Sequence, residues 1–121
     1  MQSTPDGKVW YYVDDEKDDV SKIFREPMRD GRLADREEVK EIPPLDSNAS
    51  FYVTNGGIYF VSAAKPNVLG YFNFATAKTS DILKTERHIG GNFWVSNDGK
   101  VALLPQVSDR HLDIMLAEAK L

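Results

Sequence analysis

The sequence Thr4-Pro5-Asp6-Gly7-Lys8-Val9-Trp10-Tyr11-Tyr12-Val13 places a turn signal directly before a run of β-branched and aromatic residues. Proline fixes φ, an aspartate side chain bonds nearby backbone, and glycine tolerates positive φ, so the three together favour a tight turn. Residues 9–13 carry the kinds of side chain that strands favour. The stretch therefore predicts a hairpin turn that leads into a strand.

Two further segments have the same build. Thr54-Asn55-Gly56-Gly57 leads into residues 58–61, and Ser96-Asn97-Asp98-Gly99-Lys100 leads into residues 101–104. Gly57 follows Gly7 by 50 residues, and Gly99 follows Gly57 by 42. Such spacings are typical of propeller repeats, which run about 40–50 residues each. An immunoglobulin-like sandwich would not require this repetition, so the repeat favours a propeller.

About ten short strands are expected along the chain. They are predicted at residues 9–13, 23–28, 39–42, 50–54, 58–62, 69–74, 80–83, 92–96, 101–104 and 112–117. Residues 30–40 are the best helical candidate, but they lack an apolar stripe and are interpreted as a polar connection. The expected fold is all-β, made of propeller blades that are four-stranded antiparallel sheets, with a β-sandwich as the alternative.

The repeats divide the chain into about three blades, of which the first and the last are incomplete. We expect one at residues 1–45 that lacks its inner strand, a full one at 46–87, and one at 88–121 that lacks its outer strand. Closing a propeller ring usually takes about 4–8 blades. The favoured interpretation is a piece of a longer propeller. The other is closure by self-association through the open blade edges, which unpaired strands promote.

Several motifs resemble TolB-type WD40-like repeats over nearly the whole chain. A Ser/Thr-Pro-Asp-Gly-Lys element before an apolar strand is the hallmark of that family, and it stands at residues 4–8 and, with Asn97 in place of proline, at residues 96–100. Residues 73–76 and 115–118 resemble the C-terminal blades of propellers fused to bacterial regulator or kinase proteins. The resemblance implies a bacterial parent protein and, if that parent is TolB-like, a periplasmic or other extracytoplasmic location.

Composition excludes some classes of function. The 121 residues carry a net charge of −4 with Lys and Arg scattered, so no basic stripe for nucleic acid is expected. Cysteine is absent, which excludes disulfides, thiol chemistry and Cys-ligated zinc. No apolar run approaches the roughly 20 residues that span a bilayer, so membrane insertion is not expected.

Few residues are candidates for a chemical site. Asp14, Asp15, Asp18 and Asp19 are a candidate calcium site, because Ca²⁺ takes oxygen ligands, but a solvated hairpin tip is the favoured interpretation. The two histidines, His88 and His111, are interpreted as loop residues rather than catalytic bases. Asp6, Asp98 and Asp113 recur at matching repeat positions and are expected to fix turns.

No catalytic residue, metal or cofactor is therefore predicted. The expected function is a non-catalytic module that mediates protein–protein interaction or senses a ligand, with a protein partner or the rest of a larger propeller beside it. An accessory propeller of a serine peptidase is one alternative, and a calcium- or carbohydrate-binding module is another.

Overall fold

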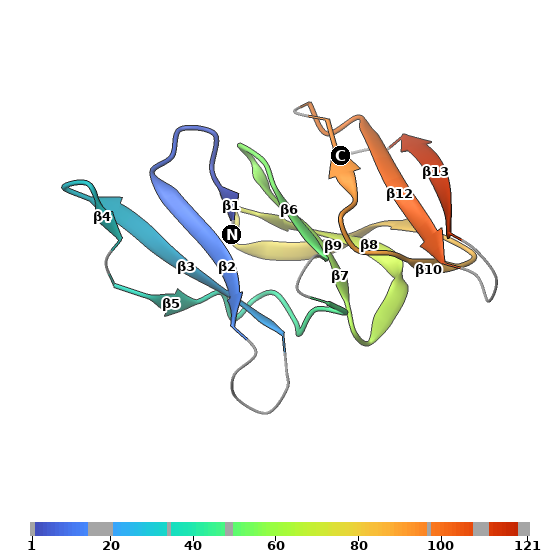
Figure 1. The fold of residues 1–121 in the computed structure, drawn as a ribbon, viewed down its shortest axis with the longest axis horizontal. Coiled ribbons are helices and arrows are strands. Elements are labelled where there is room, and N and C mark those ends of the chain that lie inside the picture. Colours follow the sequence, from blue (N-terminus) through green and yellow to red (C-terminus); the bar gives the residue numbers. More distant parts are fainter. Residues whose placement is uncertain are drawn as a thin grey trace.

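The computed structural model describes residues 2–14, 21–33, 35–47, 50–96, 98–107 and 112–118. Within these ranges every regular element is a β-strand, and the strands form three sheets that follow one another along the chain (Figure 1). All pairings between strands are antiparallel. The prediction of an all-β fold is confirmed.

Sheet 1 is formed by the first five strands. They are β1 (Gln2–Ser3), β2 (Val9–Asp14), β3 (Lys22–Arg29), β4 (Arg32–Leu33) and β5 (Glu37–Glu38). β4 and β5 both pair with β3, so they are two pieces of one outer strand. Asp30 and Gly31, with φ of 52° and 75°, join β3 to β4. Two positive φ values are what a two-residue hairpin turn needs to match the twist of its strands.

Sheet 2 is a regular four-stranded meander. Its strands are β6 (Phe51–Val53), β7 (Gly57–Ser62), β8 (Lys65–Asn73) and β9 (Lys78–Lys84), paired in that order. Every residue of β7 is buried. A strand buried on both faces needs a neighbour on each side, and sheet 2 indeed lies between the other two sheets (Figure 1).

Sheet 3 contains β10 (His88–Ile89), β11 (Trp94–Val95), β12 (Val101–Val107) and β13 (Leu112–Glu118). β10 and β11 both pair with β12, and they are two pieces of one strand interrupted at residues 90–93. Asn92 in that interruption has a positive φ of 59°. β13 pairs with the opposite edge of β12 over seven residue pairs.

The three sheets pack face to face. Alternate residues of a strand point to opposite faces of its sheet. We call the face turned toward the preceding sheet the leading face and the face turned toward the following sheet the trailing face. The leading face of sheet 1 and the trailing face of sheet 3 turn outward.

Two hydrophobic cores fill the spaces between the sheets. Between sheets 1 and 2 the buried side chains include Tyr11, Ile23, Phe51, Val53, Ile58, Phe60 and Phe72. Between sheets 2 and 3 they include Tyr59, Val61, Leu69, Ile89, Val95, Ala102 and Leu104. Consecutive residues of β7 therefore belong to different cores, as the alternation of a strand requires.

The hairpin turns of sheets 1 and 3 are built alike. Lys8 N donates to Asp6 Oδ1 and Lys100 N donates to Asp98 Oδ1, each at 3.0 Å. The glycine of each turn has positive φ, 73° at Gly7 and 72° at Gly99. The structural role expected for these two aspartates is confirmed.

The middle turn has a different build. Thr54 N donates to Gly57 O at 2.9 Å, so only Asn55 and Gly56 lie between the paired positions. This turn is shorter than its counterparts and carries no aspartate. The side chain of Asp113, the third aspartate of the repeat, lies outside the described residues.

Two expected features of the strands differ in the structure. Residues 39–42 form a turn, in which Ile42 N donates to Val39 O, because Val39 and Ile42 are both buried and three positions apart, a spacing that strand alternation does not give. An inner strand does precede Pro5, because Gln2 and Ser3 pair with Tyr11 and Trp10. The sheets are open, an arrangement that fits the sandwich alternative as well as a propeller segment.

Candidate functional site

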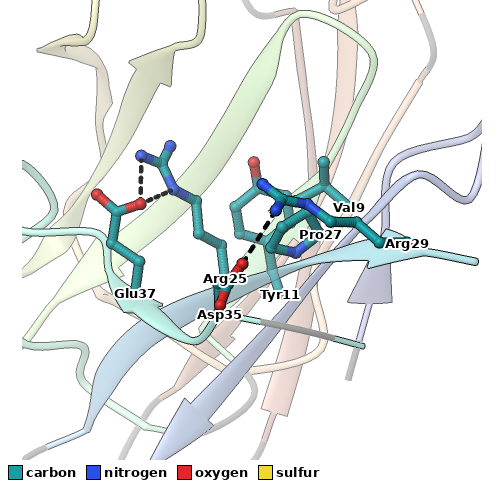
Figure 2. A pocket seen from close by; sticks show the side chains of 7 residues that line it. All are labelled: Val9, Tyr11, Arg25, Pro27, Arg29, Asp35 and Glu37. Atoms are coloured by element: carbon teal, nitrogen blue, oxygen red, sulfur yellow. Dashed lines mark hydrogen bonds and ion pairs between the residues drawn. The ribbon is translucent and has the colours of Figure 1, made fainter. Parts of the chain in front are cut away.

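A shallow pocket lies on the trailing face of sheet 1, at the margin of the first core. Its volume is about 270 Å³, and it lies between β2, β3 and the segment that leads into β5 (Figure 2). Its lining consists of Val9, Tyr11, Arg25, Pro27, Arg29, Asp35 and Glu37. The register brings these residues together, since Val9 pairs with Pro27, Tyr11 with Arg25, and Arg25 with Glu37.

Two ion pairs join residues that line this pocket. Arg25 Nη2 lies 3.2 Å from Glu37 Oε2, and Arg29 Nη1 lies 3.1 Å from Asp35 Oδ2 (Figure 2). These side chains are largely exposed, so each pair contributes little to stability. Burial raises the pKa of the Tyr11 hydroxyl, and the charge of Arg25 partly offsets that rise. The pocket can hold a small polar group but has no serine, cysteine or histidine in its lining.

The acidic run is only partly within the described residues. Asp14 ends β2, and its Oδ2 pairs with Arg36 Nη2 at 2.5 Å. Asp15, Asp18 and Asp19 lie outside the described residues. Among the residues that are described, no three His, Cys, Asp or Glu side chains gather as metal ligands would.

His88 lies at the start of sheet 3 and is held by a side chain far back in the sequence. Its Nε2 contacts Asp46 Oδ2, in the connection that leads from sheet 1 to sheet 2. Asp46 N also donates to Val61 O at 3.0 Å, so the connection is tied to β7 as well. The pair fastens the connection to sheet 3. His111 lies outside the described residues.

The most unusual surface is the outward trailing face of sheet 3. Trp94 and Leu103 are paired across β11 and β12, and their exposed fractions are 45% and 39%. Their neighbours Val95 and Ala102 are buried against sheet 2, so the alternation itself directs these two side chains outward. Sequence reasoning placed Trp94 in the expected strand at residues 92–96 and did not single it out. The signal that it missed is the alternation of Trp94 with Phe93 and Val95, which are both buried.

The outward leading face of sheet 1 is aromatic and charged. The rings of Tyr12 and Phe24 stack with centroids 6.2 Å apart, and the guanidinium of Arg36 lies 3.8 Å above the Phe24 ring. Tyr12 also donates a hydrogen bond to Glu26. Burial and that hydrogen bond raise the pKa of Tyr12 to about 12.

Comparison with protein-family models, curated proteins and solved structures found no match. No helix in the described part of the chain is long and apolar enough to cross a membrane.

Proposed function

We propose that this chain is a segment of a TolB-type β-propeller and acts as a non-catalytic module that mediates protein–protein contacts. The observation that carries the proposal is the exposed pair Trp94 and Leu103 on the trailing face of sheet 3. Exposed large apolar side chains gathered on one face of a soluble protein mark interaction surfaces. Tryptophan in particular is enriched among the residues that dominate binding energy at interfaces.

The repeated architecture supports the propeller part of the proposal. Propellers are built from antiparallel sheets that pack face to face, and the three sheets of this chain pack in that way. The hairpin turns around Asp6 and Asp98 contain the same hydrogen bond, in which the backbone nitrogen of the lysine two positions later donates to Oδ1 of the aspartate. In a complete propeller, the pocket around Arg25 would lie at the margin between two blades.

Site-specific photo-cross-linking tests the function. A benzoylphenylalanine replaces Leu103 in one variant and Ser80, an exposed residue of β9, in the control. We expect the probe at position 103 to give one discrete protein adduct that maps to a defined peptide, from a second copy or from another protein. Equal yields from the two positions, or a smear of unrelated adducts, would contradict the proposal.

A further inference from the structure

On the two outward faces of this chain lie residues whose equivalents in the other sheets are buried between two sheets. The first residue pairs beyond the three hairpin turns are Ser3–Trp10, Val53–Ile58 and Val95–Ala102. Counting from these pairs, Leu103 of sheet 3 is equivalent to Tyr11 and Tyr59 of the two earlier sheets. By the same count, Tyr12 of sheet 1 is equivalent to Phe60 and Leu104.

The following sheet decides whether a trailing-face residue is buried. Tyr11 and Tyr59 have a following sheet and are 3% and 1% exposed, whereas Leu103 has none and is 39% exposed. The leading face behaves in the same way. Phe60 and Leu104 are 6% and 0% exposed beneath a preceding sheet, whereas Tyr12 is only half-buried. Each outward face therefore lacks the neighbour that its counterparts have.

Around Leu103, the described side chains on the trailing face of sheet 3 are apolar. Val101 and Pro105 lie on either side of Leu103 on this face, and Trp94 is paired with Leu103. The register of β13 places the apolar residues Leu116 and Ile114 opposite Leu103 and Pro105, and Glu118 opposite Val101 at the end of the strand. A partner for such a face must bring apolar surface without unpaired charge, since an unpaired charge that loses water is costly.

The leading face of sheet 1 meets that requirement because its described charged side chains already have ion-pair or hydrogen-bond partners. Lys22 Nζ lies 3.4 Å from Glu38 Oε1, and Arg36 is bound to Asp14. Glu26 accepts the Tyr12 hydroxyl. Covering this face would leave none of these groups without its partner, and the aromatic rings between them would supply the apolar contact.

We propose that the trailing face of sheet 3 docks on the leading face of sheet 1 of a second copy of this chain. This inference rests on the proposed function and names its partner. The contact repeats the internal packing, in which every trailing face covers the next leading face. The contact joins two different faces, so each copy can use its trailing face for one contact and its leading face for another.

Complementation between two blocked variants tests the contact. Leu103→Lys blocks the trailing face and Tyr12→Lys blocks the leading face, and Ser80→Lys adds the same charge at an exposed site of β9 as the control. Molecular mass is measured by light scattering over a range of concentrations, and circular dichroism checks that each variant is folded. If either lysine variant unfolds, Trp94→Ser or Phe24→Ser takes its place.

If the contact joins two different faces, the variants and their mixture should give a distinctive pattern of molecular masses. Wild type and the Ser80→Lys control reach at least twice the chain mass of 13.6 kDa, and each blocked variant alone stays at one copy. An equimolar mixture of the two blocked variants restores a two-copy species, because one intact face of each kind remains. A mixture that stays at one copy, or a blocked variant that still associates alone, would overturn the inference. If wild type is a monomer and the probe at position 103 captures a different protein, the proposed function survives and this inference fails.

Discussion

Gly57 and Gly70 lie where neighbouring atoms leave no room for a side chain. A Cβ on Gly57 would lie 2.0 Å from the carbonyl oxygen of Phe72, which is backbone and cannot move away. A Cβ on Gly70 would lie 2.7 Å from the ring of Phe60, which is a side chain. The two glycines therefore permit the close approach of β7 and β8 for different reasons.

We expect both Gly57→Ala and Gly70→Ala to lower the free energy of unfolding by about 1–3 kcal/mol or more, as overpacking does. Adding Phe60→Leu should recover part of the loss in the Gly70 variant and none in the Gly57 variant. Urea unfolding of the single and double variants measures these values. Equal recovery in both backgrounds would show that the Phe60 ring is not the obstacle at Gly70.

Tyr59 is buried between sheets 2 and 3, and its hydroxyl has no hydrogen-bond partner among the described residues. Burial, with smaller effects of Tyr71 and Asp98, raises its pKa from 10.0 to about 12. The folded state thus holds this proton more tightly than the unfolded state. The stability of the fold that depends on a protonated Tyr59 is complete below pH 10 and is lost as pH rises toward about 12.

Tyr59→Phe should raise the free energy of unfolding at neutral pH by about 1 kcal/mol, because it removes an unsatisfied buried hydroxyl. It should also lessen the loss of stability between pH 10 and about 12. Tyr12→Phe is the matched control, since it lessens the same alkaline loss but lowers stability at neutral pH by removing the bond to Glu26. Denaturant unfolding at several pH values compares the two. A Tyr59→Phe variant less stable than wild type at neutral pH would contradict this account.

At the scale of elements, the hairpin turns around Asp6 and Asp98 are the parts that local sequence determines most fully. Asp98 accepts hydrogen bonds from Ser96 Oγ at 2.6 Å and from Lys100 N at 3.0 Å. The bond from Ser96 lowers the pKa of Asp98 most, followed by the bond from Lys100. Because the folded pKa lies below the ordinary 3.8, the turn's stabilisation is present above that value and lost as pH falls through the folded pKa.

We expect Asp98→Ala to lower the melting temperature at neutral pH and to have little effect once the pH is below the folded pKa of Asp98. Asp98→Asn keeps an acceptor oxygen, so it should retain more of the neutral-pH stability and lose the pH dependence. Calorimetry across the acid range measures both. A deficit in the alanine variant that is the same at acid and neutral pH would rule out the carboxylate as its cause.

Sequence reasoning predicted the longer strands and the turns but not the interruptions. The hairpin at Asn55-Gly56 and the turn at Asp6-Gly7 follow from residues a few positions apart, and both are present. The outer strand of sheet 1 breaks into β4 and β5, and the inner strand of sheet 3 breaks at residues 90–93. Such breaks depend on which strand lies alongside, and a local pattern does not contain that information.

At the scale of the whole molecule, the sequence was enough to predict which sheet faces are buried, but it was not enough to predict the pocket. The uninterrupted apolar run at residues 58–61 predicts a strand buried on both faces and hence a sheet between two others. The pocket around Arg25 instead requires the register that brings Tyr11, Arg25 and Glu37 into one row. This register is a property of the tertiary structure, and no motif in this chain predicts it.

The two tryptophans report on the two outward faces, because Trp10 lies on the leading face of sheet 1 and Trp94 on the trailing face of sheet 3. The central claim is that these unlike faces meet between copies. Chains labelled with 5-fluorotryptophan give one ¹⁹F signal for each face, and dilution should separate the copies. We predict that both signals shift with concentration and share one midpoint. Signals that do not move with concentration, or a shift of only one of them, would contradict the claim.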